Sequence, residues 1–482
     1  TSSRPGKARS SISSGIGVGP LDEILLQAKE MPGELEELAA DLSRSGADAW
    51  GRLQEAISSN ASALWDERTG ERKTLVELRS LAYASDRPLR EKAYNLELAA
   101  WKSVEIPMAA ALNGVKGFAL SLDRRRGWES ELDKAAVRSR ISRGALDGFI
   151  ASLEESLPAW RSYLAAKARA LGLERCAFYD LFAPVSLAGS REPPRYLFAE
   201  ARDLIVEKFG AFDPAMGEFA ARAFAEGWID AEPRPGKVGG AFCLDFPDAK
   251  TARVLCNFGG SFSDLSTIAH ELGHAWQREC VKDKPYVLAQ HPLILAETAS
   301  IFAETVIFEE AMKSAPPPER PGLLEIHLSE ACQVIVDILS RFYFERALFE
   351  RREKGELSPE ELCLLMIDAQ KRAYGEGLEP DRLHPYMWAA KGHYYSAELP
   401  FYNFPYAFGQ LFGAGLYARY RSEGSSFAEV YRVLLAGTGA SSAVGLTRAA
   451  RVDIEGAGFW KAGLGVYAGQ IADFNSLVDR EA

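Results

Sequence analysis

The chain has few histidines, few cysteines and no long apolar run. Its 482 residues contain 6 His and 6 Cys, and the cysteines are scattered without C-x-x-C pairs. This scattering predicts free thiols in a reducing compartment. No run of 18 apolar residues is present, so the sequence predicts no membrane-spanning helix. We therefore expect a cytoplasmic protein that has no membrane partner.

The chain also has fewer basic than acidic residues. The sequence contains 56 Lys and Arg against 67 Asp and Glu, which gives a formal net charge of -11. This negative charge argues against a nucleic-acid partner, because the phosphate backbone is itself negative. With 26% charged and 47% hydrophobic residues, the composition is typical of a globular protein.

Two of the few histidines lie in one short motif. The motif H-E-L-G-H spans residues 270–274, inside the apolar stretch 265–276, which has helical periodicity. Positions i and i+4 of a helix share a face, so His270 and His274 can bind one Zn²⁺. Glu271 lies about 100° further round the helix and is the expected base for a water molecule. The motif therefore predicts a zinc metallopeptidase.

A zinc site of this kind needs a third protein ligand. Gln277 and Cys280 occupy the positions where a metzincin carries Gly and His, so that subclass is excluded. We predict Glu297, which opens a helical segment, as the third ligand. His291 is the alternative, but a residue before Pro is restricted to extended backbone. Glu304, two turns beyond Glu297, is either a residue that orients a ligand or a solvated carboxylate.

Two short β-type runs precede the predicted zinc helix. They cover residues 239–246 and 253–258, and the turn-rich segment 247–250 separates them, which predicts an antiparallel pair. An edge strand beside the zinc helix can bind a peptide backbone by strand addition. The alternative is that the pair only packs on the helix. Ser263 and Asp264 are candidate N-caps of that helix.

The remaining sequence has predominantly helical periodicity. The clearest helical stretches cover residues 35–53, 89–120, 145–170, 196–209, 323–352 and 359–374. Residues 1–20 are rich in Ser and Gly and predict a flexible leader. We expect a mainly α protein with an N-terminal helical lobe over residues 21–140 and a catalytic zinc metallopeptidase domain over residues 141–482.

Several strings around the motif share their order and spacing with a known family. They are G-A-F-C at 240–243, R-V-L-C-N-F-G-G-S at 253–261, T-I-A-H-E-L-G-H-A at 267–275 and E-T-A-S at 297–300. In these strings the chain resembles the oligoendopeptidase F family, relatives of thimet oligopeptidase. The resemblance implies a helical zincin with a small antiparallel sheet beside the zinc helix. It also implies a deep channel that admits unfolded oligopeptides.

A tyrosine-rich segment at residues 393–407 is similar to the family's H-F-Y…P-F-Y-x-Y-x-Y-A segment. By resemblance, an imidazole and phenols of this segment donate hydrogen bonds to the oxyanion of the transition state. The candidate donors are His393, Tyr395, Tyr402 and Tyr406. Two positions depart from the family pattern, because Tyr394 replaces Phe and Phe404 replaces the usual Tyr. The alternative role of these aromatic side chains is packing in the core.

Together these patterns predict a zinc-dependent endopeptidase that hydrolyses internal bonds of short unfolded oligopeptides. His270, His274 and Glu297 hold Zn²⁺, and Glu271 takes a proton from water and passes it to the leaving amine. One alternative is an exopeptidase on the same helical zincin scaffold, either a carboxypeptidase or a dipeptidase. A second is a peptide-binding scaffold that has lost catalysis. Cleavage of end-blocked peptides, zinc content and turnover distinguish the three.

Overall fold

The computed structural model describes residues 26–187, 191, 194–235, 237–289, 293–439 and 441–480. The predicted leader over residues 1–20 and the alternative ligand His291 lie outside the described residues.

The first part of the described chain consists of helices and one hairpin. The elements are α2 (Gly33–Ser45), α3 (Ala47–Asn60), β1 (Ser62–Asp66), β2 (Glu71–Thr74), α4 (Leu75–Ser80), η1 (Leu81–Tyr83), α5 (Arg87–Arg125), α6 (Glu131–Arg138) and α7 (Arg143–Ala170). The single helix predicted over 35–53 is wrong. Gly46, with φ -93° and ψ -114°, leaves the helical region and separates α2 from α3. α5 continues through Pro107. The hairpin was not predicted.

The second part carries the sheet and the zinc motif. Its elements are η2 (Phe178–Asp180), α8 (Phe198–Phe212), α9 (Pro214–Ala225), β3 (Ile229–Asp230), β4 (Phe242–Phe246), β5 (Thr251–Leu255), α10 (Phe262–Val281), α11 (Tyr286–Ala289), α12 (Leu293–Ala296), α13 (Thr298–Ser314), α14 (Arg320–Cys332), the π-helical turn η3 (Gln333–Asp337), α15 (Ile338–Arg352), α16 (Pro359–Tyr374), η4 (Gly375–Gly377), α17 (Met387–Ala390), η5 (Gly392–Tyr395), α18 (Phe404–Glu423), η6 (Gly424–Ser426), α19 (Phe427–Gly437), α20 (Ala443–Ala449) and α21 (Ala457–Asp479). α16 begins and ends where the sequence predicts.

The small sheet has the strand order β3-β5-β4. β4 and β5 pair antiparallel, with Phe242 opposite Leu255 and Phe246 opposite Thr251, which confirms the predicted pair. β3 was not predicted, and it pairs parallel to β5. It was missed because two residues are too short for a period-2 pattern. Within the described chain β4 pairs on one side only, so it is an edge strand, and it contacts α10.

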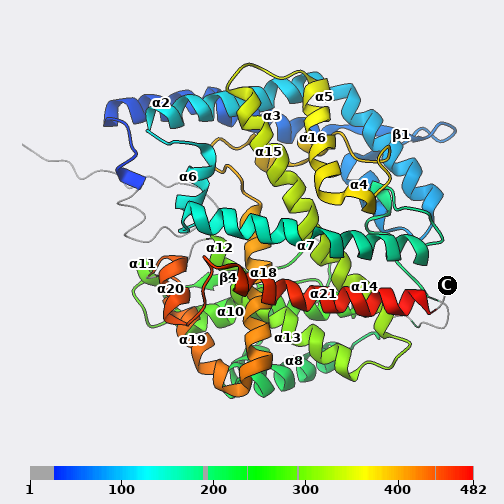
Figure 1. Cartoon of the computed structure of the whole chain (residues 1–482), viewed down its shortest axis with the longest axis vertical. Helices are drawn as coiled ribbons and strands as arrows, with labels where there is room; N and C mark the ends of the chain where they lie inside the picture. Colours follow the sequence, from blue (N-terminus) through cyan, green and yellow to red (C-terminus); the bar gives the residue numbers. More distant parts are fainter. Residues whose placement is uncertain are drawn as a thin grey trace, which may run out of the picture.

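The helices are arranged on either side of a central pair. Figure 1 shows α5, α15 and α16 in the upper half of the molecule and α8, α10 and α13 in the lower half, with α7 and α21 crossing between them. One connected set of buried side chains runs from Ala63 to Val478. The mainly α fold with a small sheet beside the zinc helix is confirmed. The division into a lobe before residue 140 and a catalytic domain after it stays a prediction.

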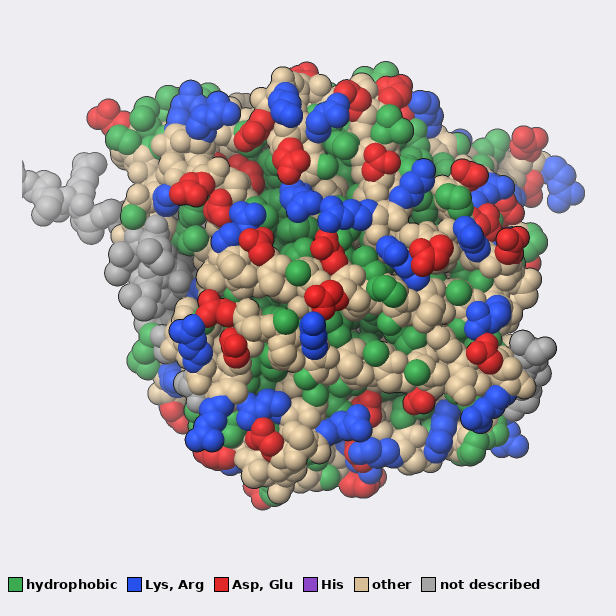
Figure 2. All heavy atoms as spheres, viewed as in Figure 1, with side chains coloured by type: hydrophobic (Ala, Val, Ile, Leu, Met, Phe, Trp, Pro, Cys, Tyr) green, Lys and Arg blue, Asp and Glu red, His purple; other side chains and the backbone are tan. Residues whose placement is uncertain are grey.

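Acidic and basic side chains are mixed on the molecular surface. On the face in Figure 2, Lys and Arg alternate with Asp and Glu over the upper and lower halves of the molecule. This face therefore presents no large field of a single sign. The prediction that no nucleic acid binds continues to rest on the net charge alone.

α10 and α13 approach each other through a glycine. A Cβ at Gly273 would lie 2.6 Å from the carbonyl oxygen of Ala299 and 2.6 Å from Cα of Ser300. Both of these are backbone atoms, so neither can move without shifting a helix. The Gly of the H-E-L-G-H motif therefore lets the backbone of the next helix come close to the two histidines. This contact sets the distance between the motif and the start of α13.

We predict that Gly273→Ala destabilises the protein by about 1–3 kcal/mol, because the new methyl group overpacks the α10–α13 contact. Gly469→Ala is the matched control, since Gly469 lies in α21 and a Cβ there meets nothing within 4 Å. Ala is the better helix former, so the control should be neutral or gain about 0.5–1 kcal/mol. Urea unfolding measures both free energies, and equal values for the two variants would contradict the proposed contact.

Candidate metal centre

The start of α10 is fixed by a reciprocal cap. Ser261 Oγ accepts a hydrogen bond from the backbone N–H of Asp264, and the Asp264 carboxylate accepts one from the N–H of Ser261. The expectation that Ser263 or Asp264 is the N-cap is therefore wrong. Ser261 caps the helix, and Asp264 is its partner three residues on, the arrangement of a capping box. The motif at 270–274 consequently lies in the middle of a 20-residue helix.

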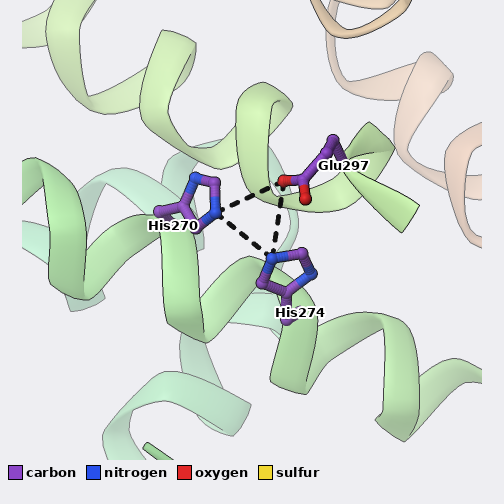
Figure 3. A group of neighbouring side chains, drawn as sticks. All are labelled: His270, His274 and Glu297. Carbon is purple, nitrogen blue, oxygen red and sulfur yellow. Dashed lines mark hydrogen bonds and ion pairs between the residues drawn. The ribbon is translucent and has the colours of Figure 1, made fainter. Parts of the chain in front are cut away.

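Three of the predicted ligands converge on one point. Figure 3 shows the rings of His270 and His274 and the carboxylate of Glu297 turned toward one another. Their ligand atoms all lie within 4.8 Å of one another. The two Nε2 atoms are 3.2 Å apart, and Glu297 Oε2 lies 3.4 Å from Nε2 of His270 and 3.6 Å from that of His274. Glu297 stands between α12 and α13.

A second layer of side chains holds two of these groups in place. His270 Nδ1 lies 3.2 Å from Glu304 Oε1, so the neutral ring that a metal ion requires would carry its proton on Nδ1 and offer the lone pair of Nε2 to the ion. Ser300 Oγ donates to Glu297 Oε2 at 2.9 Å. Of the two roles open to Glu304, its position beside the ring favours the one that orients a ligand.

The donor set and its charge fit a divalent cation. Burial favours the neutral His270 ring, but the charges of Glu304, Glu297 and Glu271 outweigh burial and raise its pKa to about 9. Carboxylates collected around two imidazoles are costly without a compensating positive charge. Two imidazole nitrogens and one carboxylate oxygen are ligands that Zn²⁺ takes in catalytic sites. The residues present therefore suit such an ion.

Glu271 follows His270 in α10, is not one of the three converging groups, and is only 5% exposed. Burial raises its pKa to about 7, while the charge of His270 and the backbone N–H of Cys243 act in the opposite direction. The contact with Cys243 ties the carboxylate to β4. A carboxyl group with a pKa near neutrality can both accept and return a proton, as a general base and acid must.

The four residues predicted as oxyanion donors have different surroundings. Tyr402 and Tyr406 are half-buried, and their hydroxyls lie 2.7 Å apart. Burial, the Tyr402 hydroxyl and the Glu297 charge raise the pKa of Tyr406, which places Tyr406 near the ligand group. The hydroxyl of Tyr395 is buried and donates to the carbonyl oxygen of Met108 at 3.4 Å. The structure therefore gives Tyr395 a packing position against α5.

A fixed tautomer makes His393 a donor. Arg341 Nη1 donates to Asn403 Oδ1 at 3.0 Å, which orients the Asn403 amide. Its Nδ2 then donates to His393 Nε2 at 2.6 Å, so the ring proton lies on Nδ1. Burial and the charges of Arg341, Lys116 and Lys391 lower the pKa of His393 to about 2, which keeps the ring neutral. The ring lies 5.9 Å from that of Tyr402.

With this geometry in hand, comparison with known proteins gives the family. The family model described as peptidase family M3 matches residues 206–465, which contain the whole ligand group and the tyrosine-rich segment. The chain belongs to peptidase family M3. The resemblance to oligoendopeptidase F is confirmed by relatives that carry this name.

Two curated relatives illustrate the similarity. The group B oligopeptidase PepB of Streptococcus agalactiae is 25% identical over 403 residues, which are 83% of this chain and 66% of that protein. The chromosomal oligoendopeptidase F of Lactococcus lactis is 26% identical over 336 residues, which are 68% of this chain and 54% of that protein. The chain thus spans between about half and two thirds of the length of these M3 relatives.

Solved structures show the same M3 fold. The oligoendopeptidase F of Enterococcus faecium superposes with a TM-score of 0.73 and 18% sequence identity, over 95% of this chain and 77% of that one. At this identity the likeness is one of fold. No helix among the described residues combines the length and apolarity needed to cross a bilayer.

Four residues that hydrogen-bond to the converging groups, to the candidate donors or to the first turn of α10 were not predicted from the sequence. They are Ser300, Glu330, Arg341 and Asn403. Ser300 and Asn403 lie inside strings that carry the family resemblance, so a search for hydrogen-bonding residues within those strings would have found them. Arg341 and Glu330 carry no such signal, because a charged residue in a long helix usually faces solvent.

We predict that the purified protein binds about one Zn²⁺ per chain and that Glu297→Ala weakens this binding by more than about 100-fold, because the carboxylate is a ligand. His291→Ala should leave the affinity unchanged. Metal titration with a fluorescent zinc chelator measures both. The opposite result, in which the His291 variant loses zinc and the Glu297 variant keeps it, would assign the third ligand to His291.

Proposed function

We propose that this chain is a zinc-dependent endopeptidase that hydrolyses internal bonds of short unfolded oligopeptides in the cytoplasm. The observation that carries the proposal is the convergence of His270, His274 and Glu297 beside the buried carboxylate of Glu271. The printed names of the relatives, an oligopeptidase and an oligoendopeptidase, support the substrate class. All six cysteines are free, which accords with a reducing compartment.

In the proposed reaction His270, His274 and Glu297 hold the zinc ion. The ion supplies Lewis acidity and lowers the pKa of water when it is bound. Glu271 takes a proton from the attacking water and returns it to the nitrogen of the leaving amine. Glu304 keeps His270 in the tautomer that presents Nε2 to the centre.

The oxyanion that forms on the scissile carbonyl needs hydrogen-bond donors. His393 presents Nδ1–H because Asn403 occupies its Nε2. In the pair Tyr402–Tyr406 one hydroxyl donates to the other, so one O–H is left for the substrate. Tyr395 is not assigned this role, since its hydroxyl is buried against α5.

The edge strand β4 offers a place for the peptide backbone. Among the described residues only one edge of β4 is paired with another strand, and a substrate can add to the other edge as a further strand. Phe242, Leu244 and Phe246 alternate along one face of β4 and are 45%, 52% and 43% exposed. Exposed apolar side chains in such a row are unusual on a free surface and suit substrate side chains. The N–H of Cys243 links the same strand to Glu271.

We predict that Glu271→Gln retains zinc and loses about 10²–10⁴-fold in kcat, because the amide keeps the shape of the side chain but cannot accept a proton.

In the parent, kcat/KM should fall as the pH drops below about 7, since protonation of Glu271 removes the base. A bound cation moves this limb to lower pH because it favours the carboxylate. Mass spectrometry of products from end-blocked peptides, recorded across pH, measures both effects.

Glu207→Gln, an exposed change of the same kind on α8, is the control and should leave kcat at the parent value. Near-parental turnover of the Glu271 variant would contradict the assignment of the base. Release of only terminal residues, and only from unblocked peptides, would indicate the exopeptidase instead. Zinc binding without any turnover would indicate a peptide-binding scaffold.

We predict that the oxyanion donors act mainly on kcat. His393→Ala, and Phe at whichever of Tyr402 and Tyr406 keeps the free O–H, should cost about 10²–10³-fold in kcat with little change in KM. Tyr395→Phe is the matched control, because it removes a buried hydroxyl and should change only stability, by about 0.5–1.5 kcal/mol. Full kcat in the zinc-loaded His393→Ala, Tyr402→Phe and Tyr406→Phe variants would show that the segment is only a packed wall.

A further inference from the structure

A small cavity lies away from the zinc ligands, between α4, α5, η3 and α15. Its volume is about 230 Å³. Tyr83 and Phe182 form one aromatic wall with ring centroids 4.7 Å apart, and Phe178 and Met387 add further apolar surface. Ligand sites for whole small molecules usually have about 300–1,000 Å³. A cavity of this size suits the end of a longer ligand.

Among the described residues that line this cavity, one cation lies beyond salt-bridge distance of every carboxylate. Three arginines of its lining are each paired with a carboxylate, in the pairs Arg79–Glu97, Arg90–Asp180 and Arg341–Asp337. Lys391 also lines the cavity, and its Nζ has neither a hydrogen bond nor a carboxylate within 4.0 Å among the described residues. Burial, followed by repulsion from Arg341, lowers the pKa of Lys391 to about 8. The site is therefore one negative charge short of balance.

His384 does not supply a further charge. It lies 3.3 Å from Glu97, but it is 1% exposed, and burial lowers its pKa. Its ring packs at 5.2 Å from Phe178 and 5.8 Å from Tyr94, so it belongs to the aromatic wall. An anion that enters the cavity would therefore interact most strongly with Lys391.

One chain of hydrogen bonds leads from the cavity to a candidate oxyanion donor. Arg341, which lines the cavity, donates to Asn403, and Asn403 donates to His393. The cavity and His393 are therefore linked through the side chain of Arg341.

We propose that this cavity binds the C-terminal carboxylate of the oligopeptide substrate, with Lys391 as its counter-ion and the aromatic wall against the last side chain. The proposal rests on the peptidase function proposed above and adds a substrate-binding residue to it. A C-terminal residue carries a carboxylate and a side chain on the same carbon, which matches a cation beside an apolar wall. An acidic side chain within a peptide offers the charge without the adjacent apolar group.

The test compares two N-acetylated peptides that differ only in a C-terminal carboxylate or amide. Binding to the zinc-loaded Glu271→Gln variant is measured by fluorescence anisotropy, and hydrolysis is measured with the parent enzyme. We expect the free acid to bind about tenfold or more tighter than the amide, because a charge-assisted hydrogen bond is lost with the amide. In the same Glu271→Gln background, a second change, Lys391→Gln, should reduce the ratio of the acid and amide affinities to about one. Lys391→Arg should retain that ratio.

Lys354→Gln, an exposed change of equal charge after α15, is the matched control and should keep the parental ratio. Equal binding of acid and amide, or an unchanged ratio in the Lys391→Gln variant, would overturn the proposal. A third peptide, amidated and ending in Glu, distinguishes the other source of a carboxylate. If it binds as tightly as the free acid, the site recognises acidic side chains and the C-terminal assignment is wrong. If the parent protein hydrolysed neither peptide while the affinity ratio was as expected, the result would contradict the proposed peptidase function and leave the carboxylate site supported.

Discussion

The close approach of three helices is the constraint on which the rest of the site depends. Gly273 brings α10 against the start of α13, and a Cβ at Gly409 of α18 would lie 2.7 Å from Cβ of Glu297. The start of α13, where Glu297 lies, is thereby held against α18 on one side and against α10, which carries both histidines, on the other. Helix pairs usually pack 8–10 Å apart, with the distance set by the side chains at the contact. Glycine at both contacts allows the carboxylate and the imidazoles to meet.

This packing brings like charges together, and the electrostatics of the site follow from it. Glu271, Glu297 and Glu304 all act on His270, and burial adds to the cost of their charges. Such an arrangement is unfavourable on its own and becomes favourable around a cation. The clustered charges at the centre destabilise the folded protein, while the connected apolar core maintains the fold.

The tyrosine-rich segment at residues 393–407 contains His393, whose orientation depends on a side chain from another helix. Asn403 and Arg341 determine which nitrogen of His393 carries the proton, so a helix distant in sequence orients this candidate donor. Arg341 also lines the cavity that contains Lys391. The proposed peptide site and the candidate donor His393 therefore depend on the same arginine.

The sequence by itself determined what is local. The i, i+4 spacing of His270 and His274 follows from helical geometry, and the antiparallel pair of β4 and β5 follows from period-2 patterning around a turn. Glu297 was also reached from the sequence, by the need for a third ligand. The break at Gly46, the short β3 and the burial of Tyr395 were decided only by tertiary structure. So were the partners of His393 and the position of Lys391 in the cavity, because contacts between residues far apart in sequence leave no periodic signal.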